Sequence, residues 1–175
     1  MKKTKTGFII FLFILQAIWI ASALTSIDEI QTETIIISKS TVLESDFSVA
    51  LQLEESQQFA PKPGDYFRPV IRKNYIYPFG TMIENIDITF LNPSIQKISK
   101  TLAIKPDPKN TLFTNAVSTQ EFNAEDFTES YYYTIDAGIK NNQHVVYLNI
   151  YISPVSYSKE SEKITIFEKV NIDIK

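Results

Sequence analysis

The sequence contains no cysteine and only one histidine among its 175 residues. Without cysteine the chain has no disulfide bonds, no lipoprotein anchor and no thiolate nucleophile. One histidine alone also argues against a transition-metal site. Glycine is scarce, at four residues, and the net charge is only −3 with both signs mixed, so no basic surface for nucleic acid or anionic lipid is indicated. A domain of this composition must rely on its apolar core for stability.

The first 23 residues have the three parts of a secretory signal peptide. Lysines precede an apolar run from Phe8 to Ile20, and Ala21 and Ala23 occupy the small-residue positions that a signal peptidase reads. The alternative is an uncleaved anchor, since the wider apolar run from Gly7 to Leu24, roughly 18 residues, is about 27 Å long as a helix and barely spans a bilayer. Both interpretations predict an exported protein, extracellular or at the cell surface, whose residues 24–175 form one domain.

Apolar and polar residues alternate with period two along most of the remaining chain, which predicts β-strands. The expected strands are 32–38, 46–54, 69–77, 83–91, 95–104, 131–135, 145–152 and 163–174. About eight strands with little helical pattern predict an all-β fold, an antiparallel β-sandwich. The run over 145–152 is apolar on both faces and predicts a central strand. We expect the last strand to pair back onto it through a polar hairpin loop over 153–163.

Two segments interrupt the strand pattern. Gln57–Pro69 contains three prolines and a glycine, which predicts a loop. Lys105–Ser130 is the longest segment without a clear strand, and such long loops are usually functional or mobile. A short helical turn is expected near Ser118, whose side chain is of a type that caps helices.

Catalytic motifs are missing from the sequence. His144 is the sole histidine, and no nucleophile-elbow motif accompanies it, so a surface position at the edge of a hairpin is favoured over a catalytic role. The acidic residues do not have the register of a calcium loop, and no phosphate loop is present. The sequence therefore predicts no catalytic residue, no metal and no cofactor. The tyrosines Tyr131–Tyr133 are interpreted as packing residues rather than a sugar-binding platform.

Three motifs occur in a characteristic order. In Tyr77-Pro78-Phe79-Gly80 the proline presets φ for a turn and the glycine permits a positive φ. Pro106-Asp107-Pro108 follows a later strand, and Pro154-Val155-Ser156-Tyr157 ends the central one, where Pro154 removes a ladder donor. Together these motifs resemble the N-terminal propeptide domain of gingipain-type cysteine peptidases. The resemblance covers roughly residues 63–175, most of the chain beyond the signal peptide.

The resemblance implies an exported domain that keeps a cysteine peptidase latent or assists its folding and is not itself catalytic. Its implied partner is the catalytic domain of a gingipain-type peptidase. Many such propeptides place a basic side chain in the specificity pocket of the enzyme. Here the peptidase-contacting segment would be the Lys105–Ser130 loop, with Lys109 as the main candidate and Lys105 at its start. The alternative for Lys109 is a solvated loop charge.

The sequence departs from the family in three respects, the first being that the usual basic or arginine-rich inhibitory insertion is not evident. Family precursors continue into a catalytic domain with a His/Cys pair, whereas this sequence ends at Lys175, so it is either a stand-alone partner or a truncated precursor. Ser156 replaces the usual arginine of the last motif. The alternative function is a cell-surface adhesion or carbohydrate-binding module that uses Tyr131–Tyr133. An enzyme in its own right is disfavoured, because few mechanisms remain without cysteine.

Overall fold

The computed structural model describes residues 30–37, 40–46, 48–106 and 124–175. Within these ranges the regular elements are ten β-strands and no helix. The expected all-β, antiparallel fold is therefore confirmed. The signal peptide over 1–23 and the helical turn expected near Ser118 lie outside the described residues.

The first sheet is built around β10 (Lys163–Ile174), the last strand of the chain. On one side β10 pairs antiparallel along its whole length with β6 (Ile86–Lys97). On its other side it pairs first with the short β9 (Val155–Ser158) and then with β1 (Gln31–Ile36). The exposed Glu168 lies where the neighbouring strand changes from β9 to β1, and the register with β6 continues across it.

The second sheet has the order β4-β5-β8-β7, with all neighbours antiparallel. Its strands are β4 (Ser56–Phe59), β5 (Arg68–Pro78), β8 (Gln143–Ser153) and β7 (Ser130–Lys140). Asn141 and Asn142 form the turn between β7 and β8, with φ angles of 50° and 61°. Positive φ at both positions is typical of the two-residue turns that match strand twist. A separate two-stranded sheet consists of β2 (Ser40–Glu44) and β3 (Val49–Leu53).

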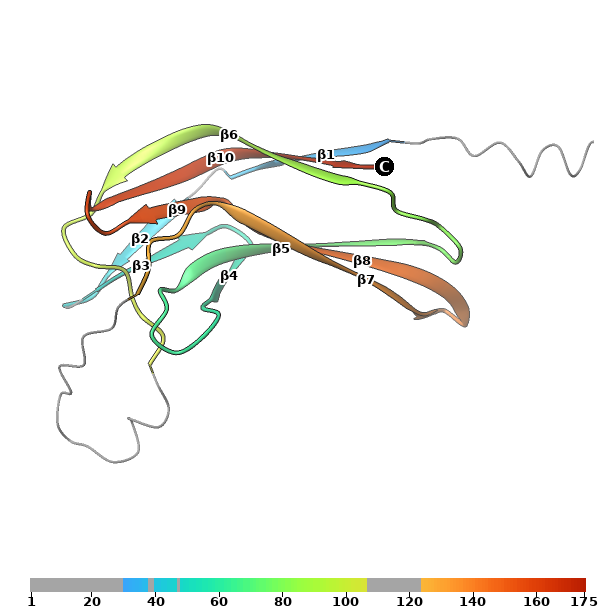
Figure 1. The fold of residues 1–175 in the computed structure, drawn as a ribbon, viewed down its shortest axis with the longest axis horizontal. Helices are drawn as coiled ribbons and strands as arrows, with labels where there is room; N and C mark the ends of the chain where they lie inside the picture. The colour runs from blue at the N-terminus through green and yellow to red at the C-terminus, as the bar shows by residue number, and fades with distance from the viewer. Residues whose placement is uncertain (1–29, 38–39, 47, 107–123) are drawn as a thin grey trace, which may run out of the picture.

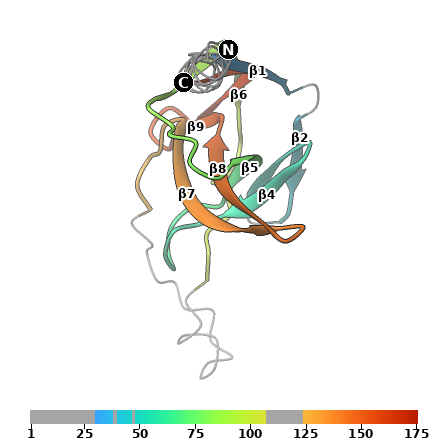
Figure 2. The same cartoon turned by 90° about the vertical axis from the view of Figure 1, so that its right-hand side faces the viewer.

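The two larger sheets lie face to face and form a sandwich (Figures 1 and 2). The link between β5 and β6 crosses from one layer to the other at the end of the sandwich. Between the layers lies a core supplied by the inward positions of both sheets and of β3. Its most deeply buried side chains include Val49, Leu51, Leu148, Ile150, Ile152, Val155, Ile164, Ile166, Val170 and Ile172. Each such aliphatic side chain contributes about 1.5–3 kcal/mol through its burial.

The prediction that β8 is a central strand is confirmed, since β5 and β7 flank it. The prediction that the last strand pairs back onto it is wrong. β8 ends at Ser153, the chain passes Pro154, and β9 and β10 belong to the opposite sheet. Pro154 has no N–H to continue the β8 ladder. The segment expected as a hairpin loop therefore carries β9, whose Val155 and Tyr157 side chains are buried.

The structure differs from the predicted strands in smaller ways where pairing is short. The Gln57–Pro69 loop contains three residues of β4, and β2 was not expected at all. The strand expected over 95–104 ends at Lys97. Beyond it Leu102 and Ile104 form only isolated bridges, to Val49 and Tyr66. Such short pairings depend on the tertiary partner that lies opposite and leave little periodic pattern in the sequence.

Candidate interaction surface

β7 (Ser130–Lys140) lies at the edge of its sheet, and most of its residues are exposed. β7 pairs with β8 without interruption, from Ser130 opposite Ser153 to Lys140 opposite Gln143. It is the terminal strand of its sheet, so no other described strand pairs with its far side. In an antiparallel ladder every second residue then directs its N–H and C=O away from the sheet. Such an edge can accept another strand.

Large apolar side chains project from both faces of β7. Tyr132 is 48% exposed, and Ile139 is 65% exposed. Tyr131, Tyr133 and Ile135 are also exposed. Isolated apolar residues are common on protein surfaces, but five exposed ones within one eleven-residue edge strand are an unusual concentration. We call the edge and faces of Ser130–Lys140 the β7 surface.

The other terminal strands have features that discourage further pairing. β6 carries Pro93, which lacks a donor, next to Asn92 with a φ of 55°. β4 and β9 have four residues each, and β1 has six. Short strands, proline and local distortions all protect an edge from unwanted partners. Within its eleven residues β7 has no proline and no positive φ, and its only lysine is the last residue.

A row of stacked side chains borders the β7 surface on the outer face of its sheet. Pairing aligns Arg72 of β5, Tyr151 of β8 and Tyr132 of β7. The two tyrosine rings stack with centroids 4.5 Å apart and planes 7° from parallel. The Arg72 guanidinium lies 5.6 Å from the Tyr151 ring centroid and donates to Asn149 Oδ1 at 2.8 Å. Asn74 donates to the same oxygen, also at 2.8 Å. This network holds the outer face rigid beside the free edge.

Polar contacts join the two sheets on the opposite side of the molecule. Lys73 Nζ lies 3.1 Å from Glu33 Oε1, and the Tyr75 hydroxyl donates to Glu33 Oε2 at 2.6 Å. The Tyr77 hydroxyl donates to Gln31 Oε1 at 2.8 Å. Burial alone would raise the pKa of Glu33, but the hydrogen bonds from Tyr75 and Lys73 outweigh it and hold that pKa below its usual value. Burial, and then the bond to Glu33, raise the pKa of Tyr75.

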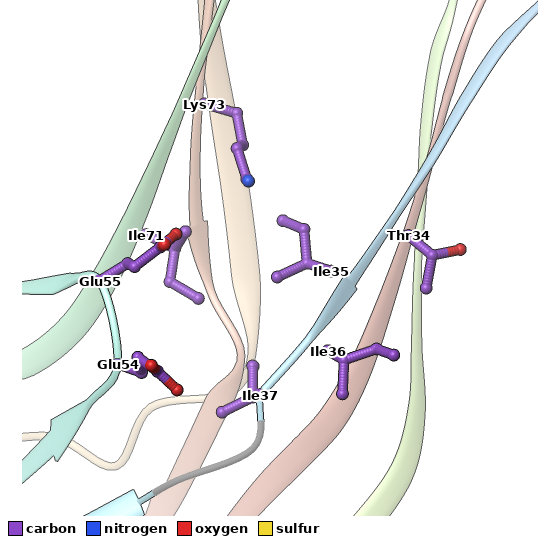
Figure 3. A pocket seen from close by; sticks show the side chains of 8 residues that line it. All are labelled: Thr34, Ile35, Ile36, Ile37, Glu54, Glu55, Ile71 and Lys73. Carbon is purple, nitrogen blue, oxygen red and sulfur yellow. The ribbon is translucent and has the colours of Figure 1, made fainter.

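Next to these contacts a groove of about 300 Å³ opens between β1, β5 and the β3–β4 turn (Figure 3). Its lining residues are Thr34, Ile35, Ile36, Ile37, Glu54, Glu55, Ile71 and Lys73. Figure 3 shows the Lys73 ammonium group pointing into the space between the strands. The lining has no histidine and no hydroxyl–base pair suited to nucleophilic catalysis. The groove is large enough to receive a side chain, and its lining residues do not form a catalytic site.

Three residues of the Pro154–Tyr157 motif are buried, and Ser156 is half-buried. Tyr157 is buried and meets Tyr66 edge to face, with ring centroids 5.0 Å apart. The Phe127 ring also lies near Tyr157, with ring centroids 6.1 Å apart, and the two residues exchange backbone hydrogen bonds. Burial and the nearby Tyr66 raise the pKa of Tyr157 to about 12. The Pro154 carbonyl accepts the N–H of Phe167 at 2.9 Å, which ties the crossing point to β10.

The Tyr77–Gly80 motif and His144 meet at one end of the sandwich. Pro78 is the last residue of β5, and its carbonyl accepts the Thr81 N–H at 3.2 Å. Gly80 has a φ of 91° within this turn. The exposed His144 ring lies 5.5 Å from the Phe79 ring. His144 thus occupies the β7–β8 hairpin end, beside an aromatic ring.

The segment expected to contact a peptidase is described only at its two ends. Lys105 donates from Nζ to the Ala60 carbonyl at 3.1 Å, and its backbone pairs with Gly64 and Asp65. Pro106 is exposed. Lys109 and Pro108 lie outside the described residues, as do Ala21 and Ala23 of the expected cleavage site. The roles of these residues stay predictions.

From the sequence, the β7 surface was considered only through Tyr131–Tyr133, as the residues of the alternative carbohydrate-binding function, and not as a free strand edge. Its tyrosines were noticed, but the strand was expected to stop at residue 135, before Asp136-Ala137-Gly138. Edge position depends on sheet order, which the residues of β7 do not encode. One signal was available, because the stretch from Ser130 to Ile139 is rich in aromatic and β-branched residues and contains no lysine or proline.

Other types of site are not found among the described residues. No group of three or more His, Cys, Asp or Glu side chains there is arranged to hold a metal ion. Likewise, the described ranges include no helix with the length and apolar character needed to cross a bilayer.

Comparison with known proteins finds similarity at the level of the fold. No protein-family profile and no curated protein sequence matches the chain. A chain in a structure on the zymogenic latency of gingipain K from Porphyromonas gingivalis matches with a TM-score of 0.54 and 11% identity, over 85% of this chain and 88% of that one. A chain in the complex of the Porphyromonas gingivalis RgpB pro- and mature domains matches with a TM-score of 0.51 and 10% identity, over 87% and 80%. The predicted resemblance to gingipain prodomains is confirmed for the fold.

Proposed function

We propose that this chain is a propeptide-like partner of a gingipain-type cysteine peptidase, which it keeps latent or helps to fold. The observation that carries this proposal is the shared fold, which extends over 85% of the chain and 88% of the chain from the gingipain K study. The order of the Tyr77, Pro106 and Pro154 motifs supports it independently of the fold comparison. The same proposal holds for a stand-alone protein and for the front part of a longer precursor.

The chain itself would be non-catalytic and exported. It has no cysteine, so the nucleophile of a cysteine peptidase must come from the partner. Export is inferred from the lysine-flanked apolar run and from the small residues Ala21 and Ala23.

We assign the main docking role to the β7 surface. Its free backbone edge can add a strand of the partner, and its exposed tyrosines can enclose apolar side chains from that strand. Tyrosine is enriched at protein interfaces, because it buries a large ring while its hydroxyl remains hydrogen-bonded. Lys109 remains the candidate for the specificity pocket of the enzyme. The proposed interface thus has a rigid strand for affinity and a basic side chain for selectivity.

An inhibition assay tests the latency role. The 175-residue chain, purified in a mild detergent, is added in increasing amounts to the mature gingipain-type peptidase of the same source, and cleavage of a peptide substrate is followed. We expect saturable loss of activity, with Lys109→Ala weakening inhibition at least tenfold if Lys109 occupies the specificity pocket. Lys97→Ala, at the exposed end of β6 and outside the β7 surface, is the matched control. Full peptidase activity at every concentration of the chain argues against latency.

A carbohydrate-binding module is the second candidate. It is favoured by one observation, the exposed Tyr132 ring stacked on Tyr151 beside Arg72. Sugars stack on such rings, and the arginine could donate to their hydroxyls. A glycan array probed with the chain and with Tyr132→Ala distinguishes the two functions. Glycan binding that Tyr132→Ala abolishes favours this candidate, and an empty array removes it.

A further inference from the structure

Two residues that line a small pocket on the outer face of the β4-β5-β8-β7 sheet each have a buried polar side-chain atom without a hydrogen-bond partner. These atoms are Arg68 Nε and Ser153 Oγ, and they are the two such side-chain atoms among the described residues. The residues that line the pocket are Phe59, Arg68, Val70, Ser130, Tyr132, Tyr151 and Ser153. Because nearly all buried polar groups have partners in folded proteins, two unpartnered atoms at one pocket indicate a place for an outside partner, either a water or a small ligand group.

The strand register places Ser153 in this pocket. Ser153 pairs with Ser130 of β7 and follows Ile152, whose side chain lies fully buried between the sheets. Successive side chains of a strand point to opposite faces, so Ser153 projects outward, away from the main core. It is nevertheless only 3% exposed, because the surrounding side chains enclose it. Ser153 is therefore a buried hydroxyl at the bottom of an outward-facing pocket.

Arg68 supplies a positive charge at the same place. Its guanidinium carbon lies 5.9 Å from the ring centroids of both Phe59 and Phe127. No carboxylate of the described residues forms a salt bridge with it. Asp65 and Asp126 line the adjacent pocket that shares Arg68, but their carboxylates accept backbone N–H groups of Lys62 and Lys159. Glu125 also lines that adjacent pocket and is exposed.

Arg72, on the same face of the sheet, has both an aromatic contact and a hydrogen-bond acceptor. It is four residues further along β5, lies over the Tyr151 ring, and donates to Asn149 Oδ1. Arg68 has the aromatic contacts without the acceptor. Among the described residues no acceptor lies within hydrogen-bond distance of Arg68 Nε, so this atom is available to an acceptor from a ligand.

The size of the pocket limits what that acceptor can be. Its volume is about 20 Å³, and a single water needs about 10–15 Å³ on this measure. A sugar ring or an aromatic side chain is too large to enter it. A carboxylate is small, planar and negative, and its two oxygens match the parallel N–H groups of a guanidinium. The Ser153 hydroxyl adds a further donor to the same group.

We propose that the pocket between Arg68 and Ser153 binds a single carboxylate of a protein partner. That carboxylate is the side chain of an Asp or Glu or the C-terminal carboxylate of a chain, both of which present the same group on a slim stem. Arg68 pairs with its oxygens, and the Ser153 hydroxyl donates to it. The pocket includes Tyr132 of the β7 surface, so a strand docked there would pass beside it. The site does not depend on the partner being a peptidase, and its test is separate from the inhibition assay.

Sodium acetate is the first probe. The 175-residue chain in mild detergent is titrated with acetate and, in parallel, with neutral acetamide at constant ionic strength, and binding is followed by saturation-transfer NMR. We expect saturable binding of acetate and none of acetamide. Arg68→Gln should lower acetate affinity about tenfold or more, because bonds to a charged group are lost. Arg72→Gln is the matched control and should change affinity less than twofold. Lack of acetate binding, or equal loss in both variants, overturns the proposal.

Ser153→Ala keeps the test valid should Arg68→Gln fail to fold. It removes a buried hydroxyl that lacks a partner, so the variant should melt at or above the temperature of the parent in the absence of acetate. Its acetate affinity should fall several-fold. A variant that melts earlier while acetate affinity stays unchanged shows a structural role for the hydroxyl and overturns the site. N-acetylglutamic acid N-methylamide, capped at its α-carboxyl, and N-acetylalanine then compare the two sources, and the tighter ligand identifies which carboxylate the pocket prefers.

Discussion

Tyr75 donates its hydroxyl to Oε2 of Glu33 at 2.6 Å and thereby connects the two sheets of the sandwich. Lys73 approaches the other oxygen of the same carboxylate at 3.1 Å. The partners are 42 residues apart in the sequence and lie on β5 and β1. β1 has only six residues and pairs only with β10 among the described strands. These contacts therefore help to fix β1 over the opposite sheet.

Removing the Tyr75 hydroxyl tests how much this contact stabilises the fold. We expect Tyr75→Phe to lower the free energy of unfolding by about 1–2 kcal/mol, since a partly buried carboxylate loses a donor. Tyr77→Phe is the matched control. Its bond to Gln31 is exposed and neutral, so a loss of less than about 0.5 kcal/mol is expected. Urea denaturation measures both, and equal effects would contradict a special role for Glu33.

The lowered pKa of Glu33 predicts a pH dependence of stability. A carboxyl whose pKa is lower in the folded state than in the unfolded state stabilises the protein at neutral pH. That contribution is complete above the ordinary value of 4.5 and is lost as the pH falls through the folded pKa. Glu33→Gln should therefore be less stable than the parent at pH 7, and the difference should shrink in acid. Melting temperatures across this range provide the measurement. Glu160→Gln, at an exposed turn, should show no such trend.

The central strand predicts a large effect of core truncation. Leu148 is fully buried on β8, so Leu148→Ala should cost about 2–5 kcal/mol through lost burial and a new cavity. Ile139→Ala, on the exposed part of the adjacent strand, should cost less than about 0.5 kcal/mol. Chemical denaturation of the two variants tests the assignment. A small loss for Leu148→Ala would indicate that β8 does not lie in the core.

The turn between β7 and β8 predicts opposite effects of two substitutions at Asn142, which has a φ of 61°. Asn142→Gly should stabilise the protein by up to about 1 kcal/mol, since glycine favours the second position of this turn. Asn142→Val should destabilise it by more than about 1 kcal/mol, because a β-branched residue resists positive φ. Melting temperatures of both variants give the signs, and a stabilising Asn142→Val would contradict the turn.

The sequence was most informative about strands with strong alternation. The strand expected over 163–174 coincides with β10, and that expected over 145–152 lies within β8. β7 was underestimated because Asp136 and Gly138 interrupt its apolar pattern, and pairing with β8 overrides this local weakness. Which strands pair was less predictable. Alternation shows which face of β10 is buried. The alternation of β10 would look the same whether the strand paired within one sheet or the other, and for this reason the pairing with β8 was wrongly inferred.

For the candidate site too, the local strand was predictable from the sequence and its place in the sheet was not. That Tyr131–Tyr133 form part of a strand was expected from their side chains, whereas their place on a free edge follows from the order of the whole sheet. The pocket at Arg68 and Ser153 joins residues 85 positions apart and has no local motif. Its two unpartnered atoms appear only once the strands are assembled.

Direct binding to a peptidase tests the central claim most sharply. The immobilised 175-residue chain is exposed to the catalytic domain of a gingipain-type peptidase from the same source, and binding is followed by biolayer interferometry. We predict saturable binding that Ile135→Lys, on the free edge of β7, weakens about tenfold, because a lysine discourages strand addition there. Ile95→Lys, at a more exposed position on β6 (65% against 46% for Ile135), should leave affinity within twofold of the parent. Absence of saturable binding by the unmodified chain would contradict the role proposed for this protein.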